Sequence, residues 1–279
     1  MKSLFVKREK PKYSIENVEP IKERATEFSK VGFSYLRKDG NNYYFTNTVP
    51  FHPENSFKQQ TIEKVFSFAY KMSFGGEGEH RASRSGGIIE RKNGEIFANT
   101  FQGKLAECAA CNYFFTLGYK VTPDFRTYKL GKWDTVDVSV GNREIAIKST
   151  KSFGQLLLLE TADWDENARY IPNKKDGTGD YDAFLLIRIK PSCEDILKQM
   201  RVLYSHYADY QELKRAILGY EWTYHCIGFV TREDLKYIIS NKYILPQGAL
   251  LNERTEMDAT NYYVQSGDMR PMSELKHLF

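Results

Sequence analysis

The chain lacks any hydrophobic run long enough to cross a lipid bilayer. Its longest apolar stretches cover residues 156–159 and 183–187, whereas a membrane-spanning helix needs about 20 consecutive apolar residues. Lys7 and Arg8 follow the first residues directly, so we expect no secretory signal peptide. These absences predict a cytoplasmic protein that makes no contact with a membrane.

Cysteine is scarce as well, with 4 residues in a chain of 279. Such usage fits reduced thiols in the cytoplasm. Cys108 and Cys111 have the spacing of a zinc-binding pair, but they fall inside a predicted helix and no second close pair follows. The sequence therefore favours packing of two small thiols in the core over a metal site.

A marked excess of one charge sign is also missing. The 40 Lys and Arg residues against 36 Asp and Glu give a net charge of +4, which permits DNA binding without requiring it. Basic residues do cluster near the N-terminus and over residues 81–92. We find no internal repeat and no low-complexity tract. The composition, 41% hydrophobic and 27% charged, is typical of a soluble globular protein with a substantial core.

Hydrophobic periodicity predicts an α/β (α+β) fold, with a central mixed β-sheet flanked by helices. Predicted helices cover residues 15–35, 58–74 and 205–218, a further helix carries Glu107, and another begins at Thr231, which Asp234 would cap reciprocally. Predicted strands cover residues 43–45, 135–140, 155–160, 183–189 and 226–230, with one more around residues 145–148.

Two of these strands form a candidate hairpin. The first places three valines on one face and Asp137 and Ser139 on the other, which is the period-two pattern of a half-buried strand. In the second strand Ile145 and Ile147 take the buried face, so Ala146 and Lys148 share the opposite one. If the strands pair across the turn at residues 141–144, Asp137 and Lys148 converge on one patch.

The order of helix, Gly118-Tyr119 turn, acidic strand, turn and lysine strand resembles the PD-(D/E)XK nuclease superfamily. The resemblance implies a restriction-endonuclease-like core. It assigns Glu107 to the acidic residue of the first helix, which would bind a second metal or hold the ligands of the first one through water. It assigns Asp137 to the metal-binding aspartate and Lys148 to the lysine that closes the motif. The main-chain carbonyl of Ile147 would be a second metal ligand. The resemblance covers roughly a fifth of the chain, and its motif is short and degenerate.

Ala146 departs from the family pattern, which normally has Asp or Glu at this position. Three explanations compete. A native acid was replaced by Ala to stop cleavage, or the acid has migrated to Glu160, or the chain is an inactive member that binds without cutting. The first two are favoured equally over the third, because Glu107, Asp137 and Lys148 would otherwise be retained without a task.

Asp124 and Asp134 are rivals for the first carboxylate. Asp134 is an odd number of positions from Asp137, so in a continuous strand it would point to the core, where an unpaired carboxylate is costly. Asp124 sits in a basic loop. Both have plainer interpretations, a turn residue before the strand for Asp134 and a loop ion pair for Asp124. The alternation of side chains along the strand therefore favours Asp137 over Asp134 as the first carboxylate.

A segment rich in glycine, residues 75–87, precedes the candidate core. Within it Arg81 and Arg84 could read guanine edges, while Ser83 and Ser85 suit phosphate contacts. A solvated linker is an equally good interpretation. Lys151, after the lysine strand, is a further candidate for DNA contact.

The resemblance points to a type II restriction endonuclease that cuts double-stranded DNA with Mg²⁺, for which Mn²⁺ can substitute. A homodimer would present one active site to each strand of a palindrome, and a DNA methyltransferase would be its functional partner in the cell. Residues 1–100 would form a helical, DNA-contacting region and residues 101–279 the core with a C-terminal extension, or all would form one integrated domain.

Other functions stay open. A Holliday-junction resolvase or repair nuclease of the same superfamily is the runner-up, and a non-catalytic DNA-binding protein is the alternative from a different class. The plainest structural interpretation is a surface hairpin in which Lys148 forms an ion pair with Asp137.

Overall fold

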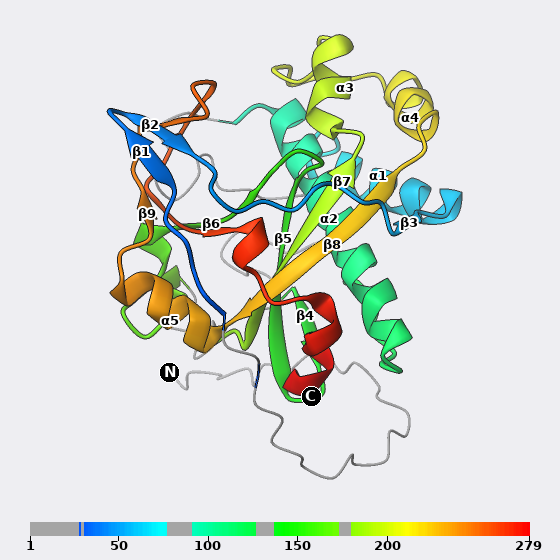
Figure 1. Cartoon of the computed structure of the whole chain (residues 1–279). Coiled ribbons are helices and arrows are strands. Elements are labelled where there is room, and N and C mark those ends of the chain that lie inside the picture. Colours follow the sequence, from blue (N-terminus) through cyan, green and yellow to red (C-terminus); the bar gives the residue numbers. More distant parts are fainter. Residues whose placement is uncertain (1–27, 29–30, 77–90, 127–136, 173–179) are drawn as a thin grey trace, which may run out of the picture.

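A five-stranded mixed sheet forms the centre of the protein (Figure 1). The computed structural model describes residue 28 and residues 31–76, 91–126, 137–172 and 180–279. The sheet has the order β3-β8-β7-β5-β4, and only β5 and β7 run parallel. The strands are β3 (Asn55–Ser56), β4 (Val138–Val140), β5 (Arg143–Lys151), β7 (Ala183–Lys190) and β8 (Thr223–Thr231).

Two smaller sheets lie beside the central one. The first has the order β6-β12-β9 and is antiparallel, while the second has the order β1-β2-β10-β11 with β2 and β10 parallel. Their bounds are β6 (Leu156–Glu160), β9 (Ile244–Leu245), β12 (Asn261–Gln265), β1 (Arg37–Asp39), β2 (Asn42–Tyr44), β10 (Leu250–Leu251) and β11 (Thr255–Glu256).

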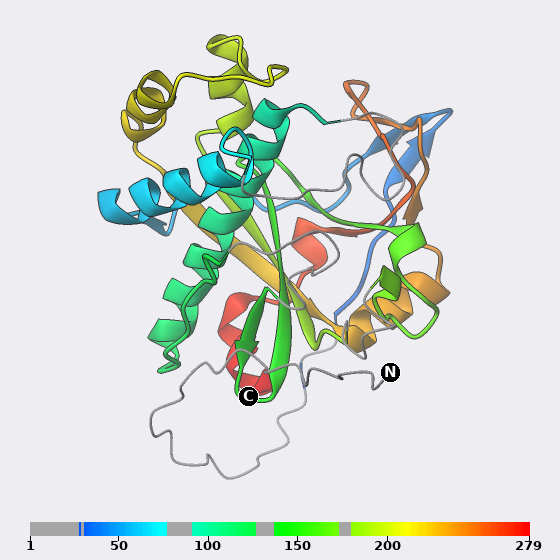
Figure 2. The same cartoon turned by 180° about the vertical axis from the view of Figure 1, so that it is seen from behind.

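The helices divide between the two faces of the central sheet, as the two views in Figures 1 and 2 show. The α-helices are α1 (Gln59–Met72), α2 (Asn93–Thr116), α3 (Cys193–Gln199), α4 (Tyr210–Leu218) and α5 (Arg232–Ser240), and 3-10 helices cover Thr161–Asp163, Ser266–Asp268 and Met272–Leu278. Helices α1 to α4 contribute to one apolar cluster, whereas α5, β6 and β12 contribute to the other. No helix in the described part of the chain is long and apolar enough to cross a membrane.

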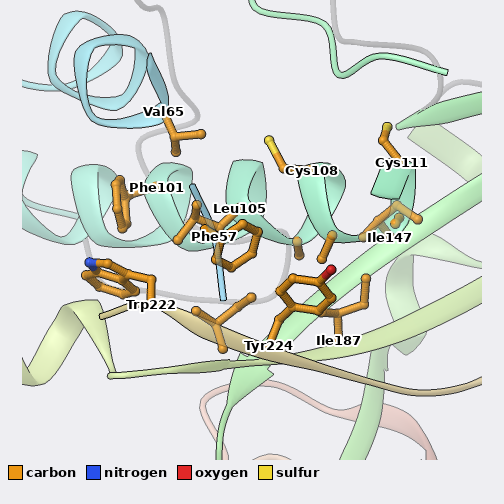
Figure 3. Close-up of a cluster of buried hydrophobic side chains, with 14 of the residues drawn as sticks. Phe57, Val65, Phe101, Leu105, Cys108, Cys111, Ile147, Ile187, Trp222 and Tyr224 are labelled. Carbon is orange, nitrogen blue, oxygen red and sulfur yellow. The ribbon is translucent and has the colours of Figure 1, made fainter. Parts of the chain in front are cut away.

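Both faces of the central sheet are therefore buried. Along β7, Ala183, Leu185 and Ile187 belong to the cluster under α2, while Phe184 and Leu186 belong to the opposite cluster. This explains why β7 is almost continuously apolar in sequence rather than alternating. Figure 3 shows the α2 side of the core, where the rings of Phe101 and Trp222 meet edge to face with centroids 4.9 Å apart.

The structure confirms the mixed sheet flanked by helices and several predicted elements. The cap of α5 is one, because the Thr231 hydroxyl accepts from the Asp234 amide while the Asp234 carboxylate accepts from the Thr231 amide. The helix predicted over residues 205–218 begins only at Tyr210, after an Asp209 cap. Helix α2 runs without interruption across the division predicted between residues 100 and 101.

The helix predicted over residues 15–35 is wrong in its described C-terminal part, since residues 31–36 are irregular. A tertiary contact explains this. The Ser34 amide and hydroxyl both donate to the Asp268 carboxylate, at 2.9 and 2.8 Å, and Gln265 donates to the Ser34 carbonyl. These partners lie far along the chain and hold the segment extended. Residues 15–27 and 29–30 lie outside the described residues.

Candidate active site on the β4–β5 hairpin

The predicted hairpin is present. Strand β4 pairs antiparallel with β5 in the register Val138 opposite Ile145 and Val140 opposite Arg143. The two-residue turn between them begins with Gly141 at φ 62°. Tight hairpin turns need positive φ at such a position, and glycine adopts it without steric cost. The turn residues thus determine the register that brings Asp137 next to β5.

Asp137 lies immediately before β4 and is half-buried. Its Oδ2 accepts a hydrogen bond of 2.7 Å from the backbone N–H of Ile147. In an antiparallel pair the N–H and C=O of one residue face the same neighbour. The Ile147 carbonyl therefore lies on the edge of β5 that Asp137 occupies, so both predicted oxygen ligands belong to one edge.

Lys148 is the next residue of β5 and is half-buried. Within the described residues its ammonium has neither an ion-pair nor a hydrogen-bond partner. The Asp137–Lys148 ion pair of the plainer interpretation is thus not formed among these residues. Lys148 offers a positive charge that no neighbouring carboxylate in the described structure neutralises.

Ala146 is only 1% exposed. It belongs to the apolar cluster on the side of β6, together with Leu157, Phe184 and Leu186. The position of the expected acid is therefore lined by hydrocarbon. A carboxylate here would need a cation or a hydrogen-bond donor to offset its desolvation.

Glu107 lies on α2 and is paired with a lysine that the sequence interpretation missed. Lys104 Nζ donates to Glu107 Oε2 at 2.5 Å and to the main-chain carbonyl of Asp124 at 2.8 Å. The two side chains are 8% and 14% exposed. The signal was available in the sequence, because residues three positions apart lie side by side on a helix.

The remaining carboxylates lie in other settings. Asp124 binds Arg126, with Nη2 2.6 Å from Oδ2, which confirms its plainer interpretation as a loop ion pair. Asp134 lies outside the described residues. Glu160 ends β6 in the three-stranded sheet, opposite Asn261. Among the described residues no three His, Cys, Asp or Glu side chains gather as a metal-binding group, so Asp137, Glu107 and Glu160 do not form one.

Asp137 and the Ile147 carbonyl still fit Mg²⁺ as part of a shared site. Mg²⁺ usually keeps several waters and is bound by one or two carboxylates together with substrate phosphates. One carboxylate and one carbonyl on the same edge meet the lower limit of that donor set. Such a site would be completed by a phosphate oxygen and would hold the ion weakly without it.

The predicted DNA contacts are only partly described. Lys151 Nζ forms an ion pair with Glu194 at 3.0 Å and lies 3.8 Å from Asp195, both on α3. Its charge is thus offset by α3. Arg81, Ser83, Arg84 and Ser85 lie outside the described residues.

The four cysteines are free and buried. Burial raises the pKa of the Cys108 thiol to about 12 and raises the pKa of Cys111 as well, with the nearby negative charge of Glu107 acting in the same direction. Thiols with such pKa values stay protonated and bind metal poorly. The prediction of core packing for Cys108 and Cys111 is confirmed.

No protein-family model, no curated protein and no solved structure matches this chain. Function must therefore be inferred from the chemistry of the hairpin and of the residues around it.

Proposed function

We propose that the protein is a metal-dependent deoxyribonuclease of the type II restriction endonuclease kind. The observation that carries the proposal is the β4–β5 hairpin. On one edge of β5 lie the Asp137 carboxylate and the Ile147 carbonyl, and the following residue, Lys148, has no partner among the described residues. A carboxylate held against β5, together with a carbonyl and an ammonium from consecutive residues of β5, suits phosphodiester hydrolysis.

Each group has a distinct task in this proposal. Asp137 and the Ile147 carbonyl would hold Mg²⁺, which when bound lowers the pKa of a water molecule and screens phosphate oxygens. Lys148 would donate to the scissile phosphate and orient the attacking water, because no carboxylate among the described residues forms an ion pair with it. The edge between Asp137 and Lys148 would thereby bind the phosphate that completes the donor set.

The order of elements is a second support. Helix α2 ends before Gly118, which has φ 90°, and Tyr119 follows. The acidic residue, the glycine turn and the lysine strand come next in the predicted order, and β5 lies between β4 and β7, with β7 parallel to it. We further propose double-stranded DNA as substrate, a homodimer as the active form, and base readout by Arg81 and Arg84.

A non-catalytic DNA-binding role is the second candidate. Two observations favour it: the apolar surroundings of Ala146, and the lack of a three-acid group among the described residues. A resolvase or repair nuclease would use the same hairpin and would differ from the main proposal only in the shape of the DNA that it cuts. Competition between plain duplex and branched DNA would separate that activity from site-specific cleavage.

The test compares the native chain with Lys148→Ala on mixed-sequence duplex DNA in Mg²⁺ or Mn²⁺. The native chain should cut, and sequencing of the ends should give one short site. Lys148→Ala should lose cleavage by orders of magnitude but keep DNA binding, because most affinity comes from distributed backbone contacts. Lys236→Ala, on the exposed side of α5, is the matched control and should cut normally.

Cleavage by Lys148→Ala that stays within about tenfold of the native rate, a transition-state loss below about 1.4 kcal/mol, would remove β5 from the active site. Binding that is indifferent to divalent metal, with no cleavage of any duplex, would instead establish the non-catalytic role.

A further inference from the structure

The ammonium of Lys104 is surrounded by groups that stabilise a cation. It is bound by a carboxylate oxygen of Glu107 and by the Asp124 carbonyl. The aromatic rings of Phe68 and Phe125 lie 5.2 and 5.8 Å from it. One carboxylate, one main-chain carbonyl and two ring faces together replace the water that a buried ammonium loses.

This donor pair matches the one on the hairpin. Asp137 and the Ile147 carbonyl again supply one carboxylate and one carbonyl, but among the described residues no ammonium binds to them. The two oxygen pairs thus differ in that the ammonium of Lys104 binds Glu107. A divalent ion at Glu107 would meet the positive charge of Lys104 at contact distance and would have to displace it.

We propose that the ammonium of Lys104 occupies the place where a divalent ion would otherwise bind Glu107. Glu107 is then not a metal ligand, and the active site takes a single divalent ion, at Asp137. The proposal rests on the proposed function for the identity of the Asp137 ion. Lys104 is a positioning residue: it ties α2 to the backbone at Asp124, in the segment that leads toward Asp137. Glu107 acts through Lys104, by holding its ammonium in place.

The experiment counts Mn²⁺ ions bound per chain by electron paramagnetic resonance, with and without duplex DNA, on the full-length protein. The native chain should bind one ion when DNA is present. Asp137→Asn should weaken that binding by roughly tenfold or more, as loss of a ligand does. Glu107→Gln should leave both the number and the affinity unchanged.

Removing the ammonium should create a second site. Lys104→Met removes the ammonium from the Glu107 carboxylate and the Asp124 carbonyl, so the count should rise from one ion to two. The double variant Lys104→Met/Glu107→Gln should return to one. Lys64→Met is the matched control, because Lys64 lies over the same Phe125 ring at 4.2 Å but binds no oxygen of this pair. Lys64→Met lowers the local positive charge by as much as Lys104→Met does and should not raise the number of Mn²⁺ ions bound.

Loss of the ion in Glu107→Gln, two ions in the native chain, or no gain in a folded Lys104→Met would each overturn the proposal. If Lys104→Met does not fold, the number of Mn²⁺ ions bound by Glu107→Gln decides whether the proposal holds. Failure of the proposed function looks different: the native chain would bind no ion and cut no DNA. Even then, an ion that Lys104→Met binds and that the double variant loses would support the proposal that Lys104 takes the place of a divalent ion at Glu107. If Lys104→Met binds no ion, that proposal is wrong.

Discussion

At position 146 a single methyl group lies where the resemblance calls for a carboxylate. The side chain is in the apolar cluster that includes Phe184 and Leu186, yet Asp137 is next to it across the hairpin. Changing Ala146 therefore probes the apolar layer and the proposed ion site at once.

Ala146→Glu should lower the free energy of unfolding by at least about 1–3 kcal/mol in the absence of metal, because even a neutral polar group costs that much in hydrocarbon. Mn²⁺ should restore much of this loss, since an ion that binds only the folded state stabilises it. The matched control is Ala146→Gln, of similar size but uncharged, which should be destabilised without recovery. Thermal melts with and without Mn²⁺ measure both. Equal recovery in the two variants would separate position 146 from any ion site.

His225 is a second residue with a measurable consequence. The residue is 9% exposed, and its Nδ1 accepts from the His52 amide at 3.4 Å. Burial, followed by the positive charge of Arg188 on the paired strand and by His52, lowers the pKa of His225 to about 4. The folded state therefore holds the ring neutral at pH values where the unfolded chain is already protonated.

The sign of the pH effect follows. Between the unfolded pKa near 6.5 and the folded pKa near 4, the unfolded state binds the extra proton, so stability from His225 is complete above the upper value and is lost as the pH falls. Urea unfolding at several pH values should show a smaller acid loss for His225→Gln than for the native chain. His206→Gln, in an exposed loop, should keep the native slope. Identical slopes for all three would contradict the assignment.

At the scale of elements, Arg188 joins β7 to two other segments. Its side chain is fully buried and donates to the Gly154 carbonyl at 2.7 Å, the Val49 carbonyl at 2.8 Å and the side chain of Gln155. These bonds anchor the turn that follows β5 and the chain before β3. Arginine suits this role because its planar fork reaches several acceptors at fixed angles.

Arg188→Met should lower the free energy of unfolding by roughly 3 kcal/mol or more, because buried acceptors are left without a donor. Arg188→Lys should recover little, since one ammonium cannot span acceptors in three directions. Lys190→Met, at the exposed end of the same strand, is the control and should change stability little. Urea denaturation gives all three values. A loss below about 0.5 kcal/mol in Arg188→Met would mean that water replaces these bonds.

At the scale of the whole molecule, two faces of one sheet are covered by different parts of the chain. The cluster under α2 and the cluster on the β6 side both join residues from either side of position 100. The first 100 residues and the rest of the chain therefore pack together in both clusters, so each protomer contains a complete central sheet. In a homodimer on DNA, each protomer would act on one strand of a palindrome.

Light scattering after size-exclusion chromatography should therefore report the mass of two 32.4 kDa chains plus that of the duplex when the protein is bound to its cut site. Cleavage should open both strands in one binding event. A monomer that cuts both strands, or nicks only one, would argue against the homodimer and for a branched-DNA or repair substrate. A mixed-sequence duplex without the site is the control.

Local sequence determined much of the central sheet and of the hairpin. Alternation of apolar residues predicted β4 and β5, Gly141 predicted the turn, and Thr231 with Asp234 predicted the start of α5. These features depend on neighbours within a few positions, which is the range over which periodicity and capping act. The placement of Asp137 against β5 follows from the same short-range register.

Tertiary structure alone decided what surrounds these residues. The apolar layer over Ala146 comes from β6 and from chain near the C-terminus, the contact of Lys104 with the Asp124 carbonyl joins a helix to a distant loop, and residues 31–36 are held extended by Asp268 and Gln265. Such contacts depend on packing between segments far apart in the chain, and local periodicity carries no information about which segments meet.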